Sequence, residues 1–346
     1  MSFTLPEMLP GIETGLNSVG FLFGAGTSKG AGYPLMGDLT KEVVAKLSAE
    51  DRGTLESILT LSGLHYDESE GSPNIEILGD LVIEASINAP KAEHDQLSSE
   101  IQRLITEIIL SVENPNLEDH VNFLDALKKR SSGSSNRVTI FTTNYDILFE
   151  LAAGEVGVRM ETGFDGSLKR TFSPDAFGLS RGSLSAGRFS IKNELHINLV
   201  KLHGSIAWMK QNETLHETGI DLVNLTHNRA IILPRRRKVM DTLAHPFDQL
   251  FTKASRILGN ECKYLVSCGF SYGDKHINDE LLIPKLREGK IRLTALCGAE
   301  PETLSELTSF PSFQIGLPDR CESNLYSKTE GTEFWKFDAL AKLLVP

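Results

Sequence analysis

The chain lacks the features that mark several whole classes of protein. Its 346 residues carry a net charge of −11, which argues against a general nucleic-acid binder, although a local basic patch remains compatible with it. No apolar run approaches membrane-spanning length, and the N-terminus lacks the basic and apolar regions of a signal peptide. No internal repeat or low-complexity tract is present either. We therefore expect a cytoplasmic protein that has no membrane partner.

Paired cysteines are also absent. Cys262, Cys268, Cys297 and Cys321 are scattered without the spacing of a disulfide framework or a thiolate metal site. We expect reduced thiols, and a disulfide pair is the alternative that the sequence leaves open.

Hydrophobic residues make up 40% of the chain and charged residues 23%, which are ordinary values for a globular protein. The length exceeds that of one small domain, so the sequence predicts one large domain with an insertion, or two modules. Short β-branched or apolar runs alternate with helical patterns. The strands are expected at 19–23, 137–141, 198–202, 230–233, 264–268 and 291–296. This alternation predicts an α/β fold with a doubly wound, parallel, Rossmann-like sheet.

The strongest helical pattern lies outside that alternation. Apolar residues between Leu97 and Val112 recur at helical spacing on one face, and further helices are expected at 55–64 and 75–87. We interpret residues 49–116 as a helical module inserted into a domain formed by 1–48 and 117–346. Covering helices of a single domain are the alternative. Residues 158–191 show no clear period, and we expect an irregular segment that could close over a site.

A glycine-rich turn follows the first expected strand. Gly24, Gly26, Gly30 and Gly32 lie between that strand and a helix that Pro34 opens. Glycines at such a turn let backbone N–H groups approach a phosphate. The dehydrogenase pattern fails, because its sixth position is Lys29, and the Walker pattern is missing. Alone, the turn does not distinguish a nucleotide loop from a plain strand-to-helix connection.

Three other strand ends carry candidate functional residues. Asn144, His203 and Gly269 each follow an apolar run. In a parallel sheet the carboxyl ends of the strands share one edge, where ligands bind. Taken singly, Asn144 could cap the following helix and His203 could be a core histidine. Their shared position favours a common site.

These segments resemble the motifs of the sirtuin superfamily, in the family's order. Residues 24–34 are similar to its first motif, Thr142-Thr143-Asn144-Tyr145-Asp146 to its Thr-Gln-Asn-x-Asp segment, and Lys201-Leu202-His203-Gly204-Ser205 to its His-Gly motif. Residues 269–278, Gly-Phe-Ser-Tyr-Gly-Asp-Lys-His-Ile-Asn, resemble the last motif of bacterial sirtuin-like NAD hydrolases of anti-phage systems.

The resemblance implies that Asn144 and His203 form the catalytic pair that cleaves the nicotinamide–ribose bond of NAD. It implies NAD as substrate, without a prosthetic group. The residues expected to bind NAD are Gly24, Ala25, Gly26, Ser28, Gly32, Pro34, Thr143, Asp146, Gly269, Ser271, Asp274, His276 and Asn278.

The chain departs from deacetylase sirtuins at two places. No cysteine lies between His203 and Cys262, so the zinc module of two Cys-x-x-Cys pairs is missing and we expect no zinc. The Asp-Phe-Arg segment of deacetylases is Leu35-Met36-Gly37 here. Both departures favour the hydrolase branch.

We therefore expect an NAD hydrolase that depletes NAD in anti-phage defence. The alternatives are an NAD-dependent protein deacylase or ADP-ribosyltransferase, and a non-catalytic nucleotide-binding subunit. The resemblance implies regulation by homo-oligomerisation or by a partner such as a HerA-type ATPase, since HerA-type ATPases and short Argonautes are partners in related systems. Arg235-Arg236-Arg237-Lys238 could meet phosphates or an acidic partner, but a solvated loop is the simpler interpretation.

Overall fold

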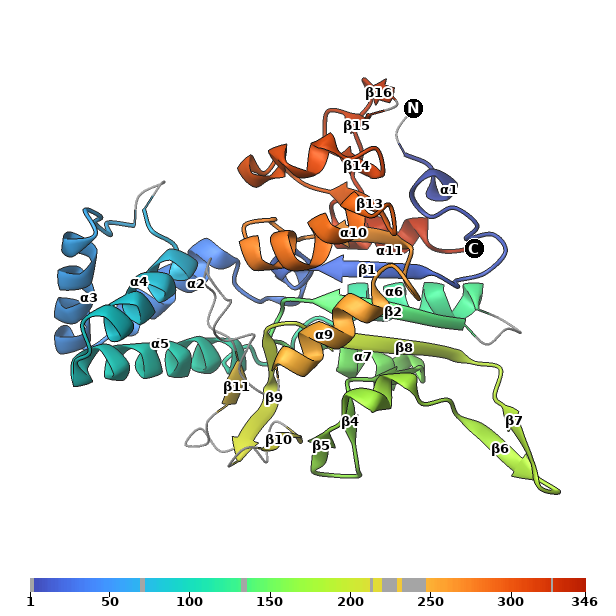
Figure 1. The fold of residues 1–346 in the computed structure, drawn as a ribbon, viewed down its shortest axis with the longest axis horizontal. Coiled ribbons are helices and arrows are strands. Elements are labelled where there is room, and N and C mark those ends of the chain that lie inside the picture. Colours follow the sequence, from blue (N-terminus) through green and yellow to red (C-terminus); the bar gives the residue numbers. More distant parts are fainter. Residues whose placement is uncertain are drawn as a thin grey trace.

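The computed structural model describes residues 3–68, 72–131, 136–211, 214–219, 229–231, 247–324 and 326–346. A nine-stranded sheet forms its centre (Figure 1). In sheet order its strands are β16 (Tyr326–Lys328), β15 (Cys321–Ser323), β14 (Phe313–Gly316), β13 (Arg292–Leu296), β12 (Tyr264–Cys268), β1 (Val19–Phe23), β2 (Asn136–Thr142), β8 (Leu195–Lys201) and β3 (Arg159–Glu161).

The seven strands from β14 to β3 are parallel, and β15 and β16 extend the sheet antiparallel at one edge. The chain starts at β1 in the middle, builds outward through β2 and β8, and later builds outward on the other side through β12, β13 and β14. This confirms the doubly wound, Rossmann-like sheet. It also places the topological switch point, where such folds bind ligands, between β1 and β12.

The alternation of side chains along β1 explains why helices cover both faces. Phe21 and Phe23 face a core that contains Phe123 of α6 (Glu118–Arg130), Phe149 of α7 (Leu148–Val156) and Phe337 of α11 (Phe337–Leu343). Leu22 faces the other core, which α9 (Phe247–Ile257) and α10 (Ile283–Arg287) cover. A strand buried on both faces reads as a continuous apolar run, as this one does.

One titratable group lies inside the first of these cores. The ring of His120 packs against Phe149 at 4.7 Å and Phe337 at 4.8 Å between ring centroids, and neither ring nitrogen has a hydrogen-bond partner. Burial lowers the pKa of His120 to about 4, and the nearby charge of Asp146 only partly offsets this. The folded protein therefore keeps His120 neutral.

We expect this histidine to make the protein less stable in mild acid. Below pH 6.5 the unfolded chain binds a proton at His120 that the folded chain excludes, so stability falls with pH until about pH 4. Between pH 7.5 and pH 5, His120 is expected to lower the free energy of unfolding by about 2 kcal/mol. Urea unfolding of the wild type and of His120→Phe at both pH values measures it. Equal losses in the two proteins would show that His120 is not responsible.

The helical module lies at one end of the molecule (Figure 1, left). It consists of α2 (Met36–Lys46), α3 (Ala49–Leu61), α4 (Ile75–Asn88) and α5 (Ala92–Leu110), and it has a core of its own. Ser48 and Asn74 cap α3 and α4 by accepting backbone N–H groups, as their residue types favour. The same core includes Tyr145 and Ile206, so the module packs against residues beyond the ends of β2 and β8. The boundary at residue 49 remains a prediction.

The expectation of irregular chain at 158–191 was wrong. A second sheet contains β4 (Phe164–Asp165) and β5 (Arg170–Phe172), together with β9 (Gly204–Gln211), β10 (Thr214–Glu217) and β11 (Arg229–Ile231). The strands β6 (Gly182–Ser185) and β7 (Arg188–Ile191) form a separate hairpin. Strands of two to four residues are too short to show a period, so no periodic pattern marks them in the sequence.

Residues 277–287 form a π-helical turn, Ile277–Leu282, that continues into α10, with Pro284 in the first turn of that α-helix. The Arg235-Arg236-Arg237-Lys238 run lies outside the described residues. All four cysteines are free and buried. Among the described helices, none is both long and apolar enough to cross a membrane.

Candidate active site

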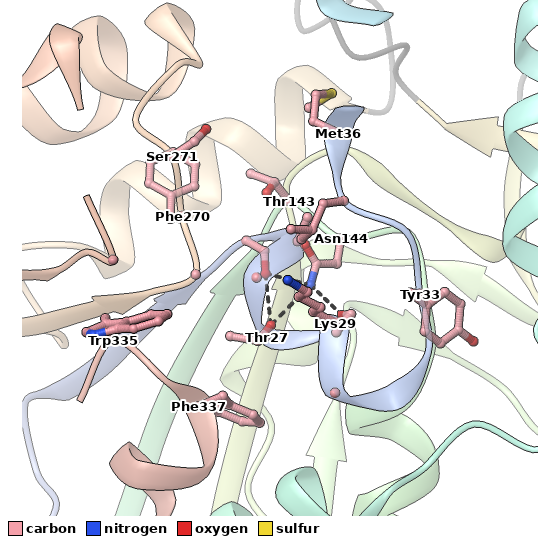
Figure 2. Close-up of a pocket in the computed structure, with 18 of the residues that line it drawn as sticks. Thr27, Lys29, Tyr33, Met36, Thr143, Asn144, Phe270, Ser271, Trp335 and Phe337 are labelled. Carbon is pink, nitrogen blue, oxygen red and sulfur yellow. Dashed lines mark hydrogen bonds between the residues drawn. The ribbon is translucent and has the colours of Figure 1, made fainter. Parts of the chain in front are cut away.

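The carboxyl ends of the central strands meet at a cavity of about 920 Å³. Segments that follow β1, β2, β8, β12 and β13 line it, as the switch point of the sheet leads one to expect. Figure 2 shows Asn144 and the turn that carries Thr27 between Phe270, Trp335 and Phe337 on one side and Tyr33 on the other. Twelve sequence-predicted site residues line the cavity: Gly24, Ala25, Gly26, Ser28, Pro34, Thr143, Asn144, Asp146, His203, Gly269, Ser271 and Asp274.

The two glycine segments touch each other at the floor of this cavity. The Gly26 N–H donates to the Gly269 carbonyl at 3.0 Å, and a Cβ at Gly26 would lie 2.6 Å from the Gly269 Cα. A Cβ at Gly24 would lie 2.6 Å from the Gly269 carbonyl oxygen. Gly269 itself has φ +65°, a conformation that favours glycine. The glycines therefore allow the segments that follow β1 and β12 to pack in direct backbone contact. The sequence did not predict this role.

Asn144 is held rigidly by the turn. Its side-chain N–H groups donate to the Gly24 carbonyl at 3.0 Å and to the Ser28 hydroxyl at 2.9 Å, with a longer contact to Thr27 Oγ1 at 3.3 Å. Because the Gly24 carbonyl can only accept a hydrogen bond, the end of the amide that faces it is the nitrogen. The amide oxygen is therefore the end of Asn144 that can accept a hydrogen bond from a ligand.

Ser28 links Asn144 to a buried carboxylate. The Ser28 hydroxyl donates to Asp146 Oδ2 at 2.7 Å, and Asp146 Oδ1 accepts the backbone N–H of Leu148. Beneath this pair the buried ammonium of Lys201 donates to the Asp146 carbonyl and pairs with Glu150 Oε1. Burial raises the pKa of Glu150, while Lys201 opposes that rise. Asp146 thus positions the turn from below.

His203 lies against a second carboxylate. Its Nε2 is 2.8 Å from Asp274 Oδ2, and both residues are buried at the wall of the cavity. Asp274 also accepts the backbone N–H of Ile277 at 3.3 Å, which ties it to the start of the π-helical turn. A carboxylate next to a histidine orients the ring and stabilises its protonated form. The arrangement therefore suits a histidine that takes up a proton during a reaction.

Three predicted site residues do not line the cavity. Gly32 ends the turn with φ +97° and faces Val112. The ring of His276 packs on Phe251 at 4.5 Å between centroids, and Asn278 donates from its side chain to the Tyr272 carbonyl at 2.7 Å. Asn278 and His276 support the segment 270–276 from behind, so their contacts indicate a structural role.

The sequence missed a set of residues that close the cavity. Two segments supply several of them: the loop after β13 and the start of α11 with the residues just before it. The lining residues concerned include Lys29, Tyr33, Glu76, Ile109, Asp119, Phe270, Cys297, Glu300, Trp335, Phe337 and Asp338. In the sequence, only the expected strand at 291–296 indicated the loop after β13, because the carboxyl end of that strand lies at the same edge of the sheet.

Two of these residues are held in their neutral forms. Burial, together with the charges of Asp146 and Glu150, raises the pKa of Tyr33 to about 12. Burial raises the pKa of Cys297 to about 12 as well, so its thiol is not a reactive thiolate near neutral pH. Neither Tyr33 nor Cys297 is therefore available as an ionised nucleophile near neutral pH.

In the described part of the chain, no group of three or more His, Cys, Asp or Glu side chains could hold a metal ion. The cavity instead combines backbone N–H groups at a glycine turn, an oriented amide, a histidine–carboxylate pair and several aromatic rings. Backbone amides of this kind suit a phosphate group, and the rings suit a flat heterocycle.

Comparison with known proteins agrees with this arrangement. No curated protein matches the chain. Residues 138–290 match the family model of the SIR2-like domain, a stretch that contains Asn144, His203 and the 269–278 segment. SIR2-like domains use NAD as substrate. The match supports placing this chain in the sirtuin-like superfamily.

Proposed function

We propose that this protein is an NAD hydrolase that releases nicotinamide and ADP-ribose. The observation that carries the proposal is the meeting of Asn144 and the His203–Asp274 pair at one cavity at the switch point of the sheet. The glycine turn at the same place offers backbone N–H groups for the diphosphate. The match of residues 138–290 to the SIR2-like domain supports NAD as the ligand.

The chemistry needs positioning more than strong acid catalysis. Nicotinamide leaves as a neutral molecule from a cationic precursor, so no proton has to be supplied to it. The ribose develops oxocarbenium character, and the site must hold the ring and an attacking water in place. The Asn144 oxygen accepts a hydrogen bond from that water or from a ribose hydroxyl. His203 takes the proton that water loses, and Asp274 stabilises the resulting imidazolium.

We place the enzyme in anti-phage defence, where depletion of NAD halts the infected cell. The resemblance of residues 269–278 to bacterial hydrolases of such systems supports this role. An enzyme of this kind must be inactive until infection. Control by a homo-oligomer or by a HerA-type ATPase meets that requirement.

Two other functions use the same site. A protein deacylase or ADP-ribosyltransferase would transfer ADP-ribose to an acyl-lysine or another acceptor, and a regulatory subunit would bind a nucleotide without cleaving it. Purified protein is incubated with NAD, with and without an acyl-lysine peptide, and nicotinamide and ADP-ribose are quantified. A hydrolase forms both at equal rates without peptide. Cleavage that requires the peptide indicates a deacylase and contradicts the proposal.

Ser28→Ala is expected to lower kcat more than it raises KM. Because the Ser28 hydroxyl is buried between Asn144 and Asp146, its loss frees the amide to rotate and does not remove a phosphate contact. We expect kcat to fall roughly tenfold and the folded state to lose about 1–3 kcal/mol. Steady-state kinetics with NAD measure the first effect. A raised KM with unchanged kcat would show that Ser28 binds the substrate directly.

Zinc is expected to be dispensable. With no cysteine between His203 and Cys262, the thiolate cluster of deacetylase sirtuins has no counterpart in this chain. Dialysis against a chelator should change neither the melting temperature nor the rate of NAD cleavage. Stoichiometric zinc in elemental analysis of the purified protein would overturn this expectation.

A further inference from the structure

The hairpin β6–β7 projects from the body of the protein, and none of the described elements covers it (Figure 1, lower right). Its register pairs Gly182 with Ile191 and Leu184 with Phe189, so these four residues share one face. Leu184, Phe189 and Ile191 are 74%, 57% and 55% exposed. The opposite face carries the polar pairs Ser183–Ser190 and Ser185–Arg188. A two-stranded hairpin is marginal in water, and one with a bare apolar face gains stability by docking.

The charge of the chain is divided between its two ends. Residues 49–116, which include α3, α4 and α5 of the helical module, hold 14 of the 46 acidic residues and 3 of the 35 basic ones. This segment therefore has a net charge of −11, which is that of the whole chain, and the remainder is neutral. The hairpin segment 181–192 has the opposite character, because it contains Arg181, Arg188 and Lys192 and no acidic residue.

Exposed apolar side chains gather at the same two ends. The described residues include ten large hydrophobic side chains that are exposed, and six of them lie either in 61–87 of the module or on the hairpin itself. On the module, Leu61 is 89% and Ile87 61% exposed. Ile87 and the exposed Glu84 are three residues apart on α4, so they share one face of that helix. The helix α3, which ends at Leu61, packs against α4.

We propose that the β6–β7 hairpin of one copy docks on the α3–α4 face of a second copy. The apolar face of the hairpin would cover Leu61 and Ile87, while its basic residues meet the acidic field of the module. The two surfaces lie at opposite ends of the longest axis of the molecule (Figure 1), so they cannot meet within one chain. A contact between two different surfaces is heterologous, and it builds a ring or an open filament.

The test begins with the mass of the wild-type protein. Light scattering after gel filtration, at about 50 mM and about 500 mM salt, should show multimers that dissociate as salt rises, because screening weakens the attraction between the charges. Phe189→Ser should weaken self-association at least about tenfold. Ser190→Ala, on the opposite face of the same strand, is the matched control and should change nothing. Arg188→Glu should weaken association at low salt, whereas Lys263→Glu, an equal charge change outside the hairpin, should not.

Mixing two defective variants separates this geometry from any other. Phe189→Ser removes part of the apolar face of the hairpin and leaves the α3–α4 face intact. Glu84→Lys/Ile87→Ser changes the α3–α4 face and leaves the hairpin intact. Each alone should be monomeric, whereas their mixture should form dimers and nothing larger, because one intact contact remains per pair. A wild type that is monomeric at low salt overturns the proposal and leaves the hairpin to a different protein. A mixture of the two variants that does not associate would also overturn the proposal, as would normal assembly by either variant alone. All readouts are masses, so they do not depend on NAD cleavage.

Discussion

His203→Ala and Asn144→Ala should each reduce NAD cleavage by about 100-fold or more. His203 is the group of the cavity placed to take up a proton, since Asp274 holds its Nε2 at 2.8 Å. Asn144 is fixed by two hydrogen bonds to the glycine turn, so its loss removes an oriented acceptor and does not simply enlarge the cavity. Initial rates of nicotinamide release, measured on purified variants, give the effect.

The structure supplies a control for this experiment. His65 is exposed and does not line the cavity, so His65→Ala should retain wild-type activity and stability. Circular dichroism and the melting temperature of each variant establish that the fold is intact. A folded His203→Ala/Asn144→Ala double variant that cleaves NAD at the wild-type rate would refute the assignment of both residues.

Gly26→Val should strongly lower the free energy of unfolding and not merely weaken NAD binding. From the sequence alone, this glycine was expected to let backbone N–H groups approach a phosphate. In the structure, a Cβ at Gly26 would lie 2.6 Å from the Gly269 Cα and 3.1 Å from the Gly269 carbonyl oxygen. Both of these atoms belong to the backbone, so neither can rotate away. The strands β1 and β12 would have to separate at their ends, which we expect to cost about 3 kcal/mol or more.

Gly53 provides the matched substitution. It lies in α3, and a Cβ there would have no heavy atom within 4 Å, so Gly53→Val should unfold like the wild type. Thermal and urea unfolding of the two variants distinguish the effects. If Gly26→Val melts with the wild type and only its affinity for NAD falls, the turn contacts ligand and not Gly269.

The sheet could be predicted from the sequence because its central strands are buried on both faces. Such strands are rich in apolar and β-branched residues, so their ends, and with them Gly24, Asn144, His203 and Gly269, could be located without coordinates. The long apolar face of α5 could be predicted for the same reason. Its period extends over enough residues to be recognised.

The parts that escaped prediction depend on contacts between segments far apart in the chain. Trp335 and Phe337 reach the cavity only because α11 packs beside β1, and no local pattern encodes that packing. The Ser28–Asp146 hydrogen bond spans 118 residues, so the motif spacing alone could not reveal that the hydroxyl faces a carboxylate. The hairpin β6–β7 was missed because its four-residue strands have too few residues to establish a period.

The most direct test of the NAD site is a crystal structure of the His203→Ala variant grown with NAD. We expect intact dinucleotide in the cavity, with its diphosphate against the backbone of residues 24–28 and the nicotinamide ribose within hydrogen-bond distance of Asn144. Dinucleotide bound elsewhere on the protein, or a cavity that stays empty at saturating NAD, would contradict the proposal that this cavity is where NAD is cleaved.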